Sequence, residues 1–328
     1  MSIDLYIVIG LALLFDFLNG VHDSSNIVAT MISSRAFRPG TALGLTALAN
    51  FFGPFLFGVA VATTIGDEVA VENVLNLNII IASLVGAILW NIATWFLGIP
   101  SSSSHALIGG LVGAVVVGAG LGAIKLDGLE KVLIALVASP LIGFAVGFVI
   151  TRLIYFLARG ATPSINKFFK NSQLVTALGM AFSHGTNDAQ KTMGVIALSL
   201  VIGGVLPSFQ VPTWVVAASA SAIALGTALG GWRLIRTLGG RFYKIRPLHS
   251  FATQLTSGIV ILTASFLGLP VSTSQVVSSA IIGVGASESV GKVRWSVAEE
   301  IVTAWFITIP ASALVSAGTY WLIITLVK

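Results

Sequence analysis

Long apolar runs separated by short polar connectors make up nearly the whole chain. At 1.5 Å per residue, a helix of about 20 apolar residues crosses the hydrocarbon core of a bilayer. The pattern therefore predicts an all-α polytopic membrane protein. The apolar segments lie at 4–31, 41–64, 77–98, 103–122, 131–158, 173–202, 213–234, 248–268, 274–287 and 297–327.

Composition supports the same class, because 56% of the residues are hydrophobic and only 9% are charged. Soluble domains carry about 25% charged residues, so a soluble fold is excluded. The net charge of +5 does not indicate a nucleic-acid partner, since the charges lie in short connectors without a basic groove. The chain also lacks the Gly-x-Ser-x-Gly, Walker A and HExxH motifs, so we expect neither an enzyme nor an ATP-driven pump.

Positive charge gathers in three of the connectors. If the segments cross the membrane alternately, these three connectors lie on one side. Cytoplasmic loops carry an excess of Lys and Arg. We therefore expect a multi-pass protein of the cell membrane with both termini outside. The charged residues are Arg35 and Arg38, then Arg159, Lys167 and Lys170, then Arg233, Arg236, Arg241, Lys244 and Arg246.

Two polar signatures occur twice, in the same order. Gly20-Val21-His22-Asp23 returns 165 residues later as Gly185-Thr186-Asn187-Asp188. Pro100-Ser101-Ser102-Ser103-Ser104-His105 returns 170 residues later as Pro270-Val271-Ser272-Thr273-Ser274-Gln275. Matching order and spacing indicate an internal duplication.

The duplication divides the chain into a first transmembrane repeat at 1–158, a cytoplasmic linker at 159–172 and a second repeat at 173–328. Each repeat has about five segments, an odd number, so the repeats should be inserted with inverted topology. Such repeats are typical of secondary transporters, in which broken helices meet near the midplane. The Pro-Ser/Thr stretches open segments 99–122 and 270–287, which we expect to be broken or re-entrant helices.

The hydroxyl signatures favour an oxyanion site. Serines and threonines after a proline place hydroxyls and free N–H groups at a helix start, where the helix dipole is positive. Two such starts that converge would hold a tetrahedral anion, although the serines could also serve only as helix caps. The expected phosphate-binding residues are Ser102, Ser103, Ser104, His105, Ser272, Thr273, Ser274, Gln275 and Lys191.

The aspartate signatures favour a cation site. Asp23 with Asn26, and Asn187 with Asp188, offer the hard oxygen ligands that sodium prefers, and ionisable groups in membrane segments are usually functional. The alternative is a structural polar pair that holds a helix break. Lys191 is either a direct anion contact or a counter-charge to Asp188 or Asp23.

The histidines of these stretches can carry protons, because histidine titrates near neutral pH. We interpret His22, His105 and His184 as hydrogen-bonding or structural residues rather than metal ligands.

The residues from Asn19 to Thr30 and from His184 to Gly194, with the two Pro-Ser/Thr stretches, resemble the inorganic phosphate transporter (PiT) family in its compact prokaryotic form. The resemblance covers nearly the whole chain. It implies symport of phosphate with sodium or protons, or uptake of a neutral metal–phosphate complex. Asp23 and Asp188 would serve cation coupling, and the Ser/Thr stretches would hold phosphate. Gln275 stands where the family often has histidine, which favours sodium over protons.

The leading hypothesis is thus sodium:phosphate symport by alternating access, with sodium as the coupling ion and no cofactor. A sulfate permease of the same fold is an alternative, and a passive anion channel is a hypothesis from another class. The expected partners are phosphate, sodium and the lipid bilayer, not nucleic acid. A homodimer is left open.

Overall fold

The computed structural model describes residues 2–56, 58–67 and 75–326, and these residues form helices without a strand. This result confirms the all-α class. The helices are α1 (Ile3–Ser33), α2 (Pro39–Leu56), α3 (Ala60–Asp67), α4 (Leu77–Leu97), α5 (Ser103–Ala119), α6 (Leu126–Leu157), α7 (Ile165–Ile202), α8 (Thr213–Leu229), α9 (Trp232–Gly240), α10 (Pro247–Phe266), α11 (Thr273–Glu288) and α12 (Trp295–Leu326). Short 3-10 turns, Leu121–Ala123 and Val290–Lys292, follow α5 and α11.

The order of elements repeats between the two halves of the chain. Each half has a long helix, an interrupted pair, two helices joined at a Pro-Ser/Thr stretch, a 3-10 turn and a 32-residue helix. The two 32-residue helices, α6 and α12, each contain one proline, Pro140 and Pro310. The repeated order agrees with an internal duplication. The predicted linker 159–172 is helical from Ile165 onward, because α7 begins there.

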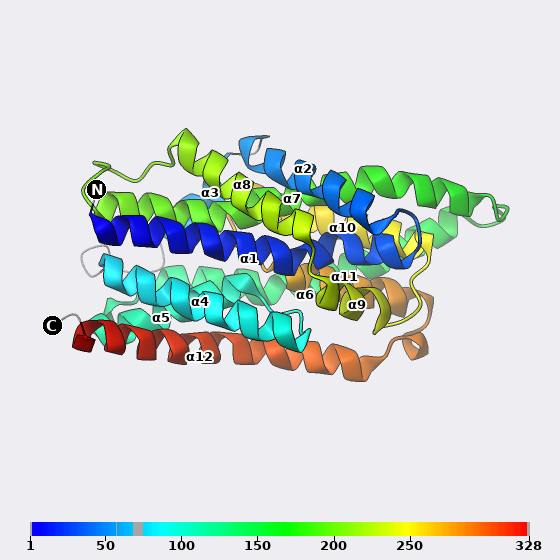
Figure 1. Ribbon diagram of the computed structural model, residues 1–328. Coiled ribbons are helices and arrows are strands. Elements are labelled where there is room, and N and C mark those ends of the chain that lie inside the picture. The colour runs from blue at the N-terminus through cyan, green and yellow to red at the C-terminus, as the bar shows by residue number, and fades with distance from the viewer. Residues whose placement is uncertain (1, 57, 68–74, 327–328) are drawn as a thin grey trace.

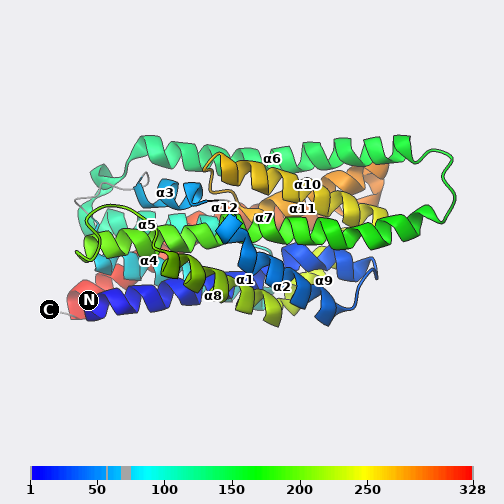
Figure 2. The ribbon, with the colours of Figure 1, turned by 90° about the horizontal axis from the view of Figure 1, so that it is seen from above.

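The two Pro-Ser/Thr stretches form the tips of two helical hairpins, α4–α5 and α10–α11. The hairpin α4–α5 lies toward the end of the molecule that carries both termini, and α10–α11 lies toward the opposite end (Figures 1 and 2). Gly98 and Gly268 end α4 and α10 with φ of 70° and 68°, which favour glycine, and the prolines stop the helix from continuing. Ser102 and Ser272 then cap the next helix by accepting a hydrogen bond from a backbone N–H three residues on.

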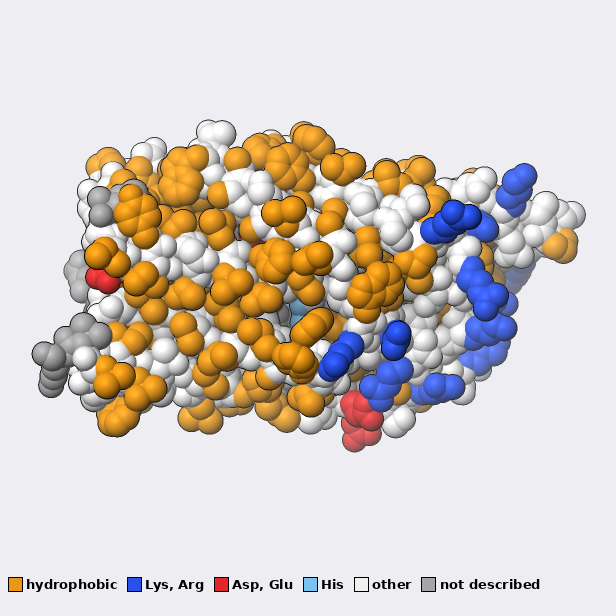
Figure 3. Space-filling view, viewed as in Figure 1, with side chains coloured by type: hydrophobic (Ala, Val, Ile, Leu, Met, Phe, Trp, Pro, Cys, Tyr) orange, Lys and Arg blue, Asp and Glu red, His pale blue; other side chains and the backbone are white. Residues whose placement is uncertain are grey.

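Apolar helices form the flanks of the molecule, as a bilayer requires. Among the described residues, α1, α4, α6 and α12 are long and apolar enough to span a membrane, and α8 with α9 passes the same test as a pair bent by 69°. Hydrophobic side chains cover the flank, while Lys and Arg gather at the end opposite the termini (Figure 3). This shared end agrees with the expected common side of the basic connectors. Its assignment to the cytoplasm stays a prediction.

Glycines bring the helices close enough to bury polar residues between them. A Cβ atom on Gly226 of α8 would overlap the Phe17 carbonyl of α1, and one on Gly20 would overlap the Ile223 carbonyl. Gly113 of α5 lies in the same way against the Ala313 carbonyl of α12, as expected from the glycine-rich sequence there. The close contact with α8 holds α1, which carries the first aspartate signature, in the interior.

Candidate functional site

The two aspartate signatures lie within unbroken helices. α1 and α7 run continuously through Asp23 and Asp188, so these residues do not hold a helix break. Both carboxylates are fully buried, as are the residues around them on each helix. A buried charge is costly unless it is paired or hydrogen-bonded. The partners of these two groups therefore define the site.

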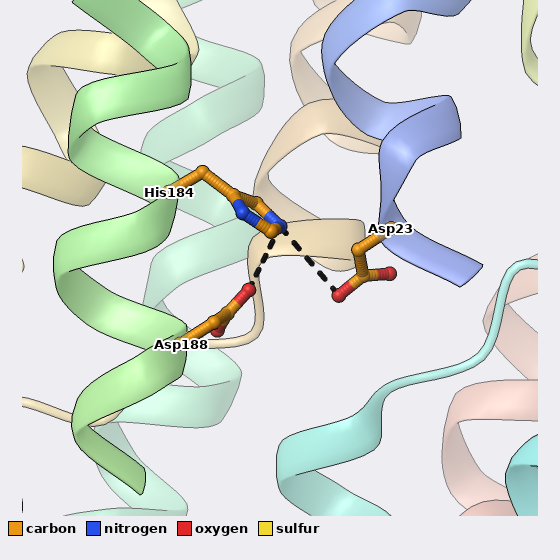
Figure 4. Close-up of side chains that lie close together, drawn as sticks. All are labelled: Asp23, His184 and Asp188. Carbon is orange, nitrogen blue, oxygen red and sulfur yellow. Dashed lines mark ion pairs between the residues drawn. The ribbon is translucent and has the colours of Figure 1, made fainter. Parts of the chain in front are cut away.

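His184 joins the two aspartates across the interface between α1 and α7 (Figure 4). Its Nε2 lies 2.8 Å from Asp188 Oδ2 and 3.7 Å from Asp23 Oδ2. Each of the three residues offers a ligand atom within 4.8 Å of the others, close enough to share one cation. From the sequence, His184 is expected to be a hydrogen-bonding or structural residue, and its position between the two aspartates is not foreseen. Its position four residues before Asp188 was the available signal, since such a spacing puts both side chains on one helix face.

Asp23 has hydrogen-bond donors from both halves of the chain. His22 Nδ1 lies 3.0 Å from its Oδ1, and the Ser274 hydroxyl donates to the same oxygen over 2.7 Å. The Thr273 hydroxyl lies 3.3 Å from Oδ2. The start of α11 thus reaches the first carboxylate.

Asp188 shares one of these donors. The Thr273 hydroxyl lies 2.9 Å from its Oδ2, and Lys191 forms an ion pair with Oδ1. Lys191 Nζ also donates to the Val271 carbonyl over 3.0 Å. Lys191 therefore contacts Asp188 as a counter-charge, and its role as a phosphate ligand stays a prediction. In this arrangement it also ties α7 to the tip of the α10–α11 hairpin.

The tips of the two hairpins contact each other beside this cluster. Ser104 of α5 donates to the Val271 carbonyl over 3.1 Å, and the side chains of His105 and Gln275 meet at 2.9 Å. The first N–H groups of α5 and α11 have no acceptor within their own helices. Two positive helix ends therefore converge next to the carboxylates, as the hydroxyl signatures predicted.

The amides of the cation signatures have different surroundings. Asn26 Nδ2 donates to the Ser274 hydroxyl over 2.9 Å, whereas Asn187 Nδ2 donates to the Ser265 hydroxyl over 3.0 Å. Both carbonyl oxygens, Asn26 Oδ1 and Asn187 Oδ1, are buried and make no hydrogen bond to the residues that the structure describes. Asn26 thus joins the Asp23 cluster, and Asn187 is attached to the α10 side. Ser103 is also buried, 3% exposed.

The structure therefore gathers most of the predicted phosphate and cation residues into one cluster. Hydroxyls at the start of α11 donate to both carboxylates, and two positive helix ends lie beside them. Such an arrangement can bind an anion and a cation next to each other. Their attraction then makes the affinity for one depend on the presence of the other.

Comparison with known proteins agrees with this chemistry. A structure described as "The sodium-dependent phosphate transporter" matches with a TM-score of 0.89 at 23% identity, over 99% of this chain and 100% of that chain, which establishes the shared fold. A "Probable low-affinity inorganic phosphate transporter" of Rhizobium meliloti is 46% identical over 95% of this chain and 94% of its own length. One of the same description from Bacillus subtilis is 43% identical over 95% of each chain. The model of the phosphate transporter family matches residues 19–316. The chain belongs to the phosphate transporter family, whose members are transporters and not enzymes.

Proposed function

We propose that the protein imports inorganic phosphate in symport with a cation, with sodium as the first candidate. One observation supports this most. Thr273 is the first residue of α11, where an anion would bind. Its hydroxyl also contacts Asp23 and Asp188, where a cation would bind. The two sites share atoms, so neither can fill or empty without affecting the other.

Coupling follows from the charges. Two unit charges about 4 Å apart interact by about 4 kcal/mol at an effective dielectric near 20. Repulsion from the two carboxylates therefore disfavours phosphate binding by roughly several kcal/mol, unless a bound cation offsets their negative charge. Lys191 already neutralises part of Asp188, so a cation near Asp23 and His184 supplies the missing charge. Phosphate then binds well only when the cation is present.

Sodium suits the oxygen ligands at this place. The Asp23 and Asp188 carboxylates, the Thr273 hydroxyl and the free Asn26 carbonyl oxygen are all hard donors. The neighbour with the same fold carries sodium dependence in its description. In the proposed cycle the hairpin tips meet over the bound ions and separate toward one side at a time.

Uptake of labelled phosphate into proteoliposomes tests the proposal. An inward sodium gradient at equal pH should drive accumulation above the external concentration. An equal potassium gradient should not, and excess sulfate should compete weakly. Uptake driven only by a pH gradient refutes the sodium assignment, and flux without saturation or accumulation refutes symport in favour of a channel.

His184 supports a second candidate, uptake of a divalent metal–phosphate complex. An imidazole between two carboxylates is a ligand set that suits divalent ions better than sodium. In this case phosphate uptake should stop when divalent ions are chelated, and a labelled metal should accumulate together with phosphate. Uptake unaffected by chelation excludes this candidate.

A further inference from the structure

Asp16 is a buried carboxylate outside the cluster described above. It lies seven residues before Asp23 on α1, which places it about 10 Å away along the helix axis. The residue is 0% exposed. Neither of its carboxylate oxygens makes a hydrogen bond to any residue that the structure describes.

Two more polar groups without hydrogen bonds surround it. Asn19, one turn along the same face of α1, is fully buried, and both of its side-chain polar atoms lack a partner among the described residues. Thr192 lies four residues after Asp188 on α7, and its hydroxyl approaches the Asp16 carboxylate without forming a hydrogen bond of normal geometry. Because α1 and α7 run in opposite directions (Figure 1), moving back along α1 and forward along α7 leads to the same place.

The charged groups around Asp16 do not neutralise it by contact. Asp188, Lys191 and His184 act on it through space, all from α7. Lys191 is itself paired with Asp188, and His184 lies between Asp188 and Asp23. A bare carboxylate in a low-dielectric interior costs several kcal/mol, on the order of a lost buried ion pair. Such a group is stable only when a cation or a proton is bound to it.

We propose that Asp16, Asn19 and Thr192 form a second site for a monovalent cation, separate from Asp23 and Asp188. A carboxylate, an amide oxygen and a hydroxyl provide three oxygen donors from two helices. No nitrogen ligand such as His184 is required. The proposal rests on cation-coupled phosphate transport as the function, and it adds one cation to the number carried with each phosphate.

The number of cations can be measured from accumulation. At equilibrium the phosphate ratio across the membrane rises with the cation ratio raised to the number of ions carried. Loss of one cation therefore lowers the limiting accumulation about tenfold under a tenfold cation gradient. A purely structural role of Asp16 changes the rate of uptake but not this limit.

The test compares the wild-type protein with Asp16→Asn in proteoliposomes, at a clamped membrane potential. One series sets a sodium gradient at equal pH, and the other sets a pH gradient at equal sodium. We expect Asp16→Asn to take up phosphate. In one of the two series its limiting phosphate ratio should be about tenfold lower than that of the wild type under a tenfold gradient, which is the effect of losing one cation. Loss in the sodium series identifies sodium, and loss in the pH series identifies a proton.

An unchanged limit in both series overturns the second site while the wild-type gradient dependence stands. A wild-type protein that responds to neither gradient instead refutes the proposed function. The matched control is Asp4→Asn, which removes an exposed carboxylate from the same helix and should leave the limit unchanged. Should Asp16→Asn fail to fold, Thr192→Val keeps the shape of the side chain. It should raise the cation concentration for half-maximal uptake, and an unchanged value counts against the site.

Discussion

The ion pair between Lys191 and Asp188 yields the sharpest test of the site. Lys191 is fully buried, and its Nζ is held by the Asp188 carboxylate and the Val271 carbonyl. Lys191→Met keeps most of the length of the side chain and removes the charge. It leaves Asp188 with two partners, His184 and Thr273, and with no permanent positive charge in contact.

The expected loss can be estimated from the burial. Removing one partner of a buried ion pair costs about 3–5 kcal/mol, because the other charge stays buried without compensation. The two remaining partners place Lys191→Met near the lower figure. At about 2.1 cal/mol/K of unfolding entropy per residue, 1 kcal/mol corresponds to roughly 1.5 °C in the unfolding temperature of a 328-residue chain, so a fall of about 4–5 °C is expected. Adding Asp188→Asn removes the uncompensated charge, and the double variant should recover most of the loss.

Thermal unfolding of the purified protein in detergent, without phosphate, measures these differences. Lys170→Met is the matched control, because Lys170 is exposed on the same helix. The reasoning is refuted if Lys191→Met unfolds at the wild-type temperature, or if the double variant is no more stable than the single one. If Lys191 instead bound phosphate directly, its loss would leave the phosphate-free protein unchanged and abolish only the stabilisation that added phosphate provides.

Three further predictions concern coupling, phosphate affinity and packing. Asp23→Asn should reach the membrane in normal amounts but lose accumulation driven by the cation gradient, and protein missing from the membrane would favour a structural role. Thr273→Ala removes a hydroxyl that lies within reach of both carboxylates. One hydrogen bond to a charged group is worth about 1.5–3 kcal/mol, so the variant should raise the phosphate concentration for half-maximal uptake about tenfold or more. Ser103→Ala should raise it less, and equal values in wild type and both variants would contradict an anion site at the starts of α5 and α11. Gly226→Ala should lower the unfolding temperature by forcing α8 from α1, whereas Gly179→Ala, which has open space, should raise it slightly.

The fold was largely predictable because lipid restricts what a chain can do. Apolar length and the repeated Pro-Ser/Thr stretches were sufficient to predict all-helical segments that are interrupted after Pro100 and Pro270. Helix ends were harder to place. Segment 41–64 is two helices, α2 and α3, and segment 213–234 ends at a sharp bend between α8 and α9, since no apolar pattern records the angle between two helices.

The site was predictable in its residue types but not in its contacts. Asp23 and Asp188 were found because charged residues stand out in an apolar run. Their link through His184 depends on how α1 and α7 pack, which a single sequence does not specify. For the same reason the sequence left two roles open for Lys191. Asp16 is also a charged residue in an apolar run, but it lies outside both repeated signatures, so the repeat does not mark it as a site residue.

The two halves contribute unequally to the cluster, although their elements correspond one to one. The start of α11 reaches both carboxylates through Thr273. Within the described part of the chain, the start of α5 instead contacts the opposite hairpin, through Ser104 and His105. Displacement of the α10–α11 tip therefore breaks hydrogen bonds to Asp23 and Asp188 together. Displacement of the α4–α5 tip leaves both intact. Under the proposed function, the occupancy of the carboxylate site is therefore linked most directly to the position of one hairpin, because the two halves reach the carboxylates unequally.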